Sequence, residues 1–212
     1  ETESEFGTPR SVMSAEIQIK GGVPSPQDQV IADLYVGLVK DSLKKEVYPA
    51  YLAGLSYDLR AVDAGIQILI EGFEDKQLLL FRLVLERFLS LKIDDAKLTT
   101  EKESFKKNVS NLALNKPYQQ ALNTLQELLI STKHEPNKLL ANIDNVNTTA
   151  LLKWRERMLT GVSIRAGIHG NVTDSDLTKF KNYLEETLPL LAVNRFTPDL
   201  LKVDKIYDHK MK

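Results

Sequence analysis

The chain has 212 residues, of which 42% are hydrophobic and 27% are charged, and its 28 basic and 29 acidic residues leave a formal net charge of −1. This length and apolar content predict one large domain with a sizeable core. The balanced charge argues against a nucleic-acid or anionic-membrane binder, and the absence of cysteine excludes disulfides and thiolate metal sites.

The first expected element is a strand over residues 11–20, followed by a helix. Polar and apolar residues alternate in "SVMSAEIQIK", so one side of the strand carries Met13, Ala15, Ile17 and Ile19. Ser25 suits the N-cap of a helix and Pro26 its first position. We expect this helix to run to about Glu46 and to end near Pro49.

The next stretch, "GLSYDLRAVDAGIQILIEGF", predicts a β-hairpin. The first arm is expected over Ser56 to Ala61 and the turn at Asp63-Ala64-Gly65. Gly72 is expected to close the second arm, whose buried side carries Ile66, Ile68 and Ile70.

A block of helices is expected after the hairpin. The predicted helices are Leu78 to Leu91, a polar helix that starts at Asp94-Asp95, the stretch "YQQALNTLQELLIS" after Pro117, a short helix around Lys138–Asn142, and Thr148 to Leu159. In the third of these, one face aligns Ala121, Leu125, Leu128 and Leu129. The longest apolar run, "LLLF", is far shorter than the roughly 20 residues that span a bilayer, so we expect no membrane partner.

A strand and a helix complete the expected domain. In "GVSIRAGIHG" the alternating residues predict a buried strand with Val162, Ile164, Ala166 and Ile168 on one side. Thr173 and Asp176 form a capping box for a helix whose inner face carries Leu177, Phe180, Leu184 and Leu188. Strands early and late with helices between them predict an α+β fold, a mostly antiparallel sheet with its helices packed on one face.

Three segments are expected along the chain. Residues 1–10 form an entry linker, residues 11–191 a single α+β domain, and residues 192–212 an exit linker toward a following domain. The opening "ETESEFGTPR" has no initiator Met and no resemblance to a signal peptide. An excised fragment and a natural product are both compatible with this start.

The residues offer few candidates for catalysis. His134, His169 and His209 share no helical turn and have no His or Cys partner at metal-ligand spacing. We expect His134 and His209 in polar surface segments. His169, at the end of the last strand, is expected in a turn, with the lining of a cleft as the less favoured alternative.

Two further groups have plain structural explanations. The acidic pairs Asp94–Asp95 and Glu185–Glu186 are sequence neighbours, and neighbours on a helix do not face each other. Four tyrosines lie close together in the sequence: Tyr35, Tyr48, Tyr51 and Tyr57. We expect them at the edge of the core rather than on a peptide-binding surface. We therefore predict no catalytic and no metal-binding residue, and substrate-binding residues stay unknown.

Several stretches resemble the large pitrilysin/insulysin zinc metallopeptidases, whose active site carries an inverted H-x-x-E-H motif. The segment "LVKDSLKKEVYPAYLAGLSYDL" (residues 38–59) is similar to part of the third of their four homologous domains. In the same order, "GFEDKQLLL", "NKPYQQAL" and "IHGNVT" are similar to further stretches of that domain, and "EFGTPR" resembles the linker entering it. The resemblance covers about Phe6 to Leu191, and several motifs in one order make it specific.

The resemblance implies an α+β fold and a place in the non-catalytic half of such an enzyme. The two halves close around a chamber that takes in unfolded peptides, and the zinc lies in the first domain, so no cofactor is expected in this chain. In the resembling register Asp33, Val36 and Gly37 stand where His, Glu and His would be needed. Because valine accepts no proton and glycine binds no zinc, we expect this chain alone to be inactive.

The expected partners are peptide substrates, reached through the parent enzyme, and the other domains of the same polypeptide, with no nucleic acid. An isolated domain would expose surfaces that those domains cover, so self-association is also expected. The periplasm is favoured for a bacterial protein, and the cytoplasm is compatible. The alternative function is a stand-alone, catalytically dead scaffold or subunit related to this family; an independent enzyme is the least favoured.

Overall fold

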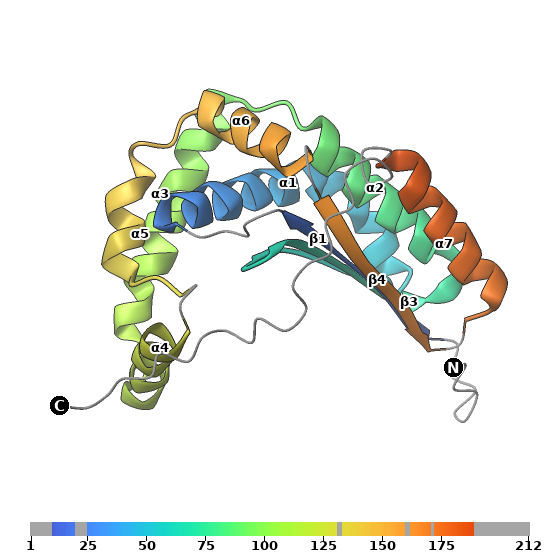
Figure 1. Cartoon of the computed structure of the whole chain (residues 1–212), viewed down its shortest axis with the longest axis horizontal. Coiled ribbons are helices and arrows are strands. Elements are labelled where there is room, and N and C mark those ends of the chain that lie inside the picture. The colour runs from blue at the N-terminus through green and yellow to red at the C-terminus, as the bar shows by residue number, and fades with distance from the viewer. Residues whose placement is uncertain (1–9, 20–24, 131–132, 160–161, 171, 189–212) are drawn as a thin grey trace.

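The computed structural model describes residues 10–19, 25–130, 133–159, 162–170 and 172–188. These residues form one four-stranded sheet and a set of helices (Figure 1). The strands are β1 (Arg10–Ile19), β2 (Ser56–Val62), β3 (Gly65–Phe73) and β4 (Val162–Gly170). The helices are α1 (Pro26–Leu52), α2 (Gln77–Ser90), α3 (Asp95–Asn111), α4 (Pro117–Leu129), α5 (Pro136–Ile143), α6 (Thr148–Leu159) and α7 (Asp174–Thr187), with 3₁₀ turns at Glu74–Lys76 and Leu112–Leu114.

The sheet has the strand order β2-β3-β1-β4, and each neighbouring pair is antiparallel. The strand β1 lies between β3 and β4, so Ile17 stands opposite Ile66 on one side and Ile164 on the other. Successive side chains of a strand point to opposite faces, and the predicted inward side of β1 is buried, namely Met13, Ala15, Ile17 and Ile19. The predicted α+β fold is confirmed.

Helices cover one face of this sheet (Figure 1). Helix α1 packs on β2, α2 on β3 and α6 on β1. In the core between them Tyr35 of α1 is fully buried, and its hydroxyl donates a 2.6 Å hydrogen bond to the backbone carbonyl of Phe88 in α2. The ring of Trp154 in α6 lies 5.7 Å from that of Tyr35. These aromatic contacts join three helices over the sheet.

The opposite face of the sheet is polar, and Figure 1 shows no described helix lying across it. Because the side chains alternate, the residues next to the inward ones point to this face. They include Glu16, Asp58, Arg60, Glu71 and Arg165. The sheet therefore presents one apolar face to the helices and one polar face on its other side.

Three predicted helix starts are confirmed in atomic detail. The Ser25 hydroxyl accepts a 3.0 Å hydrogen bond from the backbone N–H of Asp28 at the start of α1. Asp94 caps α3 through its carboxylate. Thr173 and Asp176 form the predicted reciprocal capping box at the start of α7. Each cap satisfies backbone donors that the first turn of a helix leaves free.

Helix α1 is longer than predicted. The prediction ended it at about Glu46, near Pro49, but α1 runs to Leu52 with Pro49 inside it. Proline removes one backbone hydrogen bond of the helix, and the helix nevertheless continues for most of a turn. Pro49 therefore marks the last turn of α1 rather than its end.

The hairpin of β2 and β3 turns at residues 63–64, close to the prediction. Gly65 has φ +152°, and a Cβ there would lie 2.1 Å from the carbonyl oxygen of Ile17 in β1. This close approach of β1 requires glycine at the position. Gly72, which was expected to close the second arm, instead lies inside β3.

Strand β4 differs from the buried strand that its alternating sequence predicts. Val162 is buried, but Ile164 and Ile168 are only half-buried, and Ala166 is exposed. Among the described strands β4 pairs with β1 alone, at one edge of the sheet. Alternation sets the direction in which a side chain points, but the cover over an edge strand depends on the helices around it.

Helix α7 joins the core through aromatic side chains. Phe180 packs edge-on against Phe81 of α2, with ring centroids 4.9 Å apart, and Tyr183 lies 6.3 Å from Phe81. Phe180, Leu184 and Leu188 are buried as predicted. Leu177, predicted on the same inner face, is 49% exposed.

The domain boundaries stay predictions, because most of residues 1–10 and all of residues 192–212 lie outside the described part of the chain. His209 falls there as well. Among the described helices, none has the combination of length and apolar sequence that crossing a bilayer requires.

Candidate functional site

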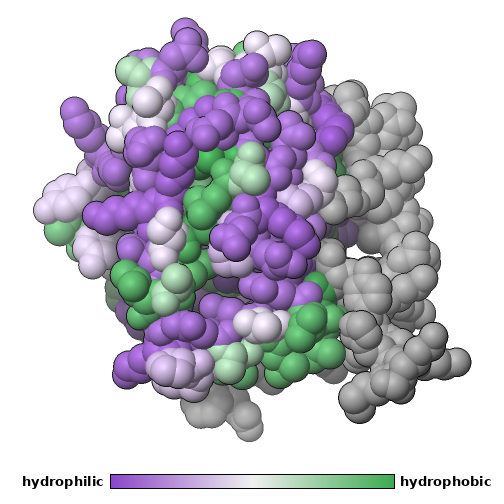
Figure 2. All heavy atoms as spheres, turned by 90° about the vertical axis from the view of Figure 1, so that its left-hand side faces the viewer, coloured by the Kyte–Doolittle hydropathy of each residue, from purple (hydrophilic) through white to green (hydrophobic). Residues whose placement is uncertain are grey.

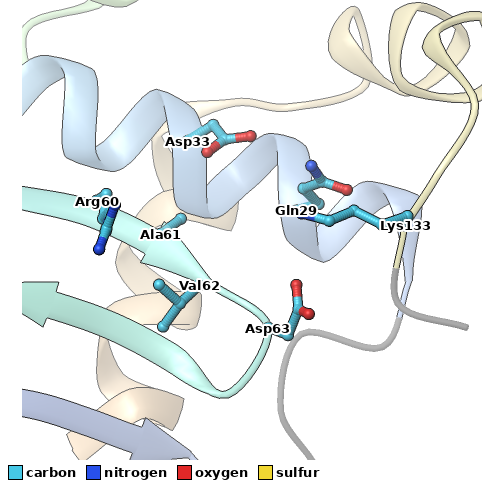
Figure 3. A pocket seen from close by; sticks show the side chains of 7 residues that line it. All are labelled: Gln29, Asp33, Arg60, Ala61, Val62, Asp63 and Lys133. Carbon is cyan, nitrogen blue, oxygen red and sulfur yellow. The ribbon is translucent and has the colours of Figure 1, made fainter. Parts of the chain in front are cut away.

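A pocket of about 300 Å³ opens between α1 and the turn that joins β2 to β3 (Figure 3). Gln29 and Asp33 line it from α1, residues 60–63 line it from the end of β2 and the turn, and Lys133 lines it from the segment before α5. In Figure 3 the side chain of Lys133 reaches across the opening toward Gln29. The pocket is formed by parts of the chain that lie far apart in sequence.

The chemistry of this pocket is that of a polar binding site. Its lining includes two carboxylates and two cationic side chains, from Asp33, Asp63, Arg60 and Lys133. These groups offer charge and hydrogen bonds to a polar ligand. None of the described residues that line the pocket carries a hydroxyl, thiol or imidazole group, so the candidate nucleophiles among them are the carboxylates and the amine of Lys133.

Burial raises the pKa of Asp33 from 3.8 to about 6. The loss of water around the carboxylate disfavours its charged form. A hydrogen bond from Gln29 and the positive charge of Lys133 act in the opposite direction but do not cancel the effect of burial. Asp33 therefore exchanges its proton much closer to neutral pH than an exposed aspartate does.

Asp33→Asn is expected to stabilise the chain at neutral pH by about 3 kcal/mol. Because the folded carboxyl binds its proton more tightly than the unfolded one, the parent loses stability as pH rises from about 4 to about 6. Asparagine does not ionise, so the variant lacks this loss. Urea unfolding across that pH window measures the difference, which should vanish below it.

Asp41→Asn is the matched control on the same helix. Lys44, followed by Lys97, holds the pKa of Asp41 below its usual value, so this carboxylate favours the folded state when it is charged. Its replacement should destabilise the chain slightly at neutral pH, opposite in sign to Asp33→Asn. If the parent and Asp33→Asn give parallel curves of stability against pH, the assigned pKa of Asp33 is wrong.

The three positions that the family register sets in place of zinc-site residues lie in different surroundings. Asp33 lines the pocket. Val36 is 6% exposed and belongs to the hydrophobic core. Gly37 lies against α3, since a Cβ added there would be 2.0 Å from a carboxylate oxygen of Glu101. Helix α1 thus presents these three positions to a pocket, to the core and to another helix.

These residues do not fit a zinc site. Zinc in proteins is held by His, Cys, Asp or Glu side chains, and Asp33 alone of the three provides one. Among the described residues, no group of three or more such side chains is placed to hold a metal ion.

The remaining candidates are scattered over the structure. His169 is exposed at the end of β4 and lines a second pocket, of about 360 Å³, together with residues at the ends of β1 and β3. Its placement is that of the less favoured alternative, a histidine lining a cleft. His134 is half-buried beside Lys138, and burial followed by the charge of Lys138 lowers its pKa.

The four tyrosines do not form one cluster. Tyr35 is fully buried and Tyr57 is half-buried against the core, while Tyr48 and Tyr51 are 59% and 70% exposed at the end of α1. The expected core-edge position holds for Tyr57 only. In the same turns of α1, Val47 and Ala50 pack against the core, so Tyr48 and Tyr51 belong to the side of the helix that faces away from it.

Sequence comparison relates the chain to a family of peptidases. Residues 1–142 match a family model described as "Middle or third domain of peptidase_M16". The insulin-degrading enzyme of Homo sapiens is 28% identical over 186 residues, which is 88% of this chain and 18% of the relative. Nardilysin of Rattus norvegicus is 26% identical over 175 residues, 82% of this chain and 15% of that protein. The chain thus spans less than a fifth of the length of these relatives.

Structural comparison shows the same fold in solved structures. The crystal structure of pitrilysin matches with a TM-score of 0.82 at 18% identity and covers 89% of this chain and 20% of that one. A conserved protein from Enterococcus faecalis V583 matches with a TM-score of 0.60 at 13% identity, covering 82% of this chain and 46% of that one. The fold therefore occurs both in a very long chain and in a much shorter one.

Proposed function

Because this chain belongs to the peptidase M16 family, through the family's middle or third domain, we propose that it is a non-catalytic domain of a zinc metalloendopeptidase. Its task is to help enclose peptide substrates in a chamber whose active site lies in another domain. The family match over residues 1–142 is the observation that carries this proposal. The family description names a peptidase, and the insulin-degrading enzyme of Homo sapiens is about five times as long as this chain.

The side chains of α1 support the inactivity in this proposal. Metal-dependent hydrolysis needs a metal held by several ligands and a base that takes a proton from water. Val36 and Gly37 supply neither function, and Val36 is buried in the core. Asp33 alone, beside Gln29 and Lys133, is a polar pocket residue rather than part of a catalytic set.

The polar face of the sheet is the surface that we propose for the chamber wall. It is free of described helices, and its outward side chains carry both signs of charge, as in Asp58, Arg60 and Glu71. Such a surface stays hydrated and offers weak contacts to many peptide sequences. It therefore suits enclosure of a substrate better than tight binding of one ligand.

The alternative is a stand-alone, catalytically dead scaffold or subunit of this family. The similarity to the Enterococcus faecalis structure supports this alternative, because the fold there belongs to a chain only about twice as long as this one. That likeness concerns the fold alone.

The reading frame upstream of Glu1 separates the two functions. For the peptidase domain we expect the frame to stay open for several hundred residues and to encode an H-x-x-E-H motif there. A start codon close to Glu1 would contradict the peptidase proposal and support the scaffold. Intact-mass measurement of the natural gene product would show whether the predicted longer polypeptide is made.

A further inference from the structure

Helix α4 and the 3₁₀ turn before it carry apolar side chains that the described part of the chain leaves exposed. We call this set the apolar row: Leu114, Tyr118, Leu122, Leu125, Leu128 and Leu129. Its members are 40% to 82% exposed. Residues 118, 122, 125 and 129 follow the alternating spacing of four and three that places side chains in one line along a helix. Figure 2 shows apolar atoms at the lower end of this face of the molecule, where α4 lies.

The orientation of α4 is the reverse of that expected for a surface helix. A surface helix turns its apolar side toward the core and its polar side toward water. In α4 the half-buried positions include Asn123 and Glu127, on the side opposite the row, while no residue of the helix is buried. The predicted alignment of Leu125 with its neighbours is therefore correct, but the aligned face points away from the described core.

The row carries no charged side chain. The one charged residue inside α4 is Glu127, and about 160° of helical rotation separates it from Leu125. An uncharged face of leucines is typical of permanent interfaces, which resemble the interior of a domain, rather than of transient contacts with polar rims. The surface therefore fits an apolar partner that stays bound.

The lengths of the relatives indicate where this partner comes from. The match to the middle or third domain covers residues 1–142 and so includes α4. The chain spans 18% of the insulin-degrading enzyme and 20% of pitrilysin. In proteins of this kind most of the polypeptide lies outside the matched domain and is attached to it at a high effective concentration.

We infer that the apolar row is the docking surface for another domain of the same polypeptide, which covers it with apolar side chains. This inference rests on the proposed function, because it needs a longer polypeptide. It also gives two surfaces of the chain different roles. The apolar row makes a fixed contact between domains, and the polar face of the sheet is left for the chamber.

A single introduced cysteine tests this inference. The chain contains no cysteine, so in Leu125→Cys the new thiol is its sole one, and its rate of alkylation reports its exposure. The variant is made in the 212-residue chain and in the complete gene product, and mass spectrometry follows the peptide that contains position 125. Thr124→Cys is the control, since it is exposed on the same helix outside the row.

We expect Leu125→Cys to react at the rate of an exposed thiol in the 212-residue chain and at least about tenfold more slowly in the complete product. Thr124→Cys should react at similar rates in both. Equal rates for Leu125→Cys in the two proteins would overturn the inference and leave the proposed function standing. Equal protection at both positions would also overturn it, because the row would not be the specific contact.

Two further outcomes are distinguishable. If alkylation of Leu125→Cys in the 212-residue chain slows as the protein concentration rises, a second copy covers the row, and the interdomain contact is contradicted. If the complete gene product is no longer than this chain, the proposed function itself fails together with the inference.

Discussion

Val36→Glu is expected to lower the free energy of unfolding by about 4 kcal/mol at neutral pH, a large part of the stability of an ordinary domain. Val36, a residue of α1, is 6% exposed and packs in the hydrophobic core. A carboxylate placed there loses its hydration in apolar surroundings. Denaturant unfolding followed by circular dichroism measures the change.

Val36→Ala separates the effect of charge from the effect of lost packing. The alanine should cost about 2 kcal/mol at every pH, because it only removes buried methyl groups. Burial raises the pKa of the new glutamate, so its folded form holds a proton that the unfolded form has lost, and its penalty should grow as pH rises above about 4. If Val36→Glu is as stable as Val36→Ala at neutral pH, the position can accept a catalytic base, and a central argument for inactivity fails.

Phe81→Ala is expected to cost about 4 kcal/mol of unfolding free energy. The ring is fully buried in α2 and packs edge-on against Phe180, with centroids 4.9 Å apart, and near Tyr183 in α7. Truncation leaves a cavity between two helices and removes both aromatic contacts. Chemical denaturation measures the loss, which should appear in the midpoint of a single transition.

Leu79→Ala is the matched control on the same helix. Leu79 is 64% exposed, and its truncation should change the stability by less than about 0.5 kcal/mol. The pair also tests cooperativity, because α7 lies beyond the residues 1–142 that match the family model. If Phe81→Ala produced two separate transitions, α7 would not belong to the same folding unit as α2.

The parts of the fold that the sequence predicts well are those that local chemistry determines. Ser25, Asp94 and Thr173 cap helices where their side chains reach free backbone donors. The alternation in β1 sets its buried side because β1 is a central strand whose inward face lies in the core beneath the helices. The alternation in β4 sets only a direction, since β4 is an edge strand and Ala166 stays exposed.

The candidate site could be predicted only in part. The family resemblance points to Asp33, but the other side chains of its pocket come from distant segments, and Lys133 is one hundred positions further along the chain. No local pattern brings a hairpin turn and a loop before α5 to the same helix. The exposure of the apolar row of α4 could not be predicted from the sequence either. A periodic pattern defines the row, but the tertiary contacts decide whether it is covered.

The most direct test of the central claim is hydrolysis of a quenched fluorescent peptide in the presence of added zinc. The chain is assayed alone and with the separately purified N-terminal half of the complete gene product, after circular dichroism has shown that both are folded. We expect the chain to be inert alone and to raise the activity of the N-terminal half, because it completes the chamber. Cleavage by the chain alone that a chelator stops would contradict the claim, since it would require a metal site within these 212 residues.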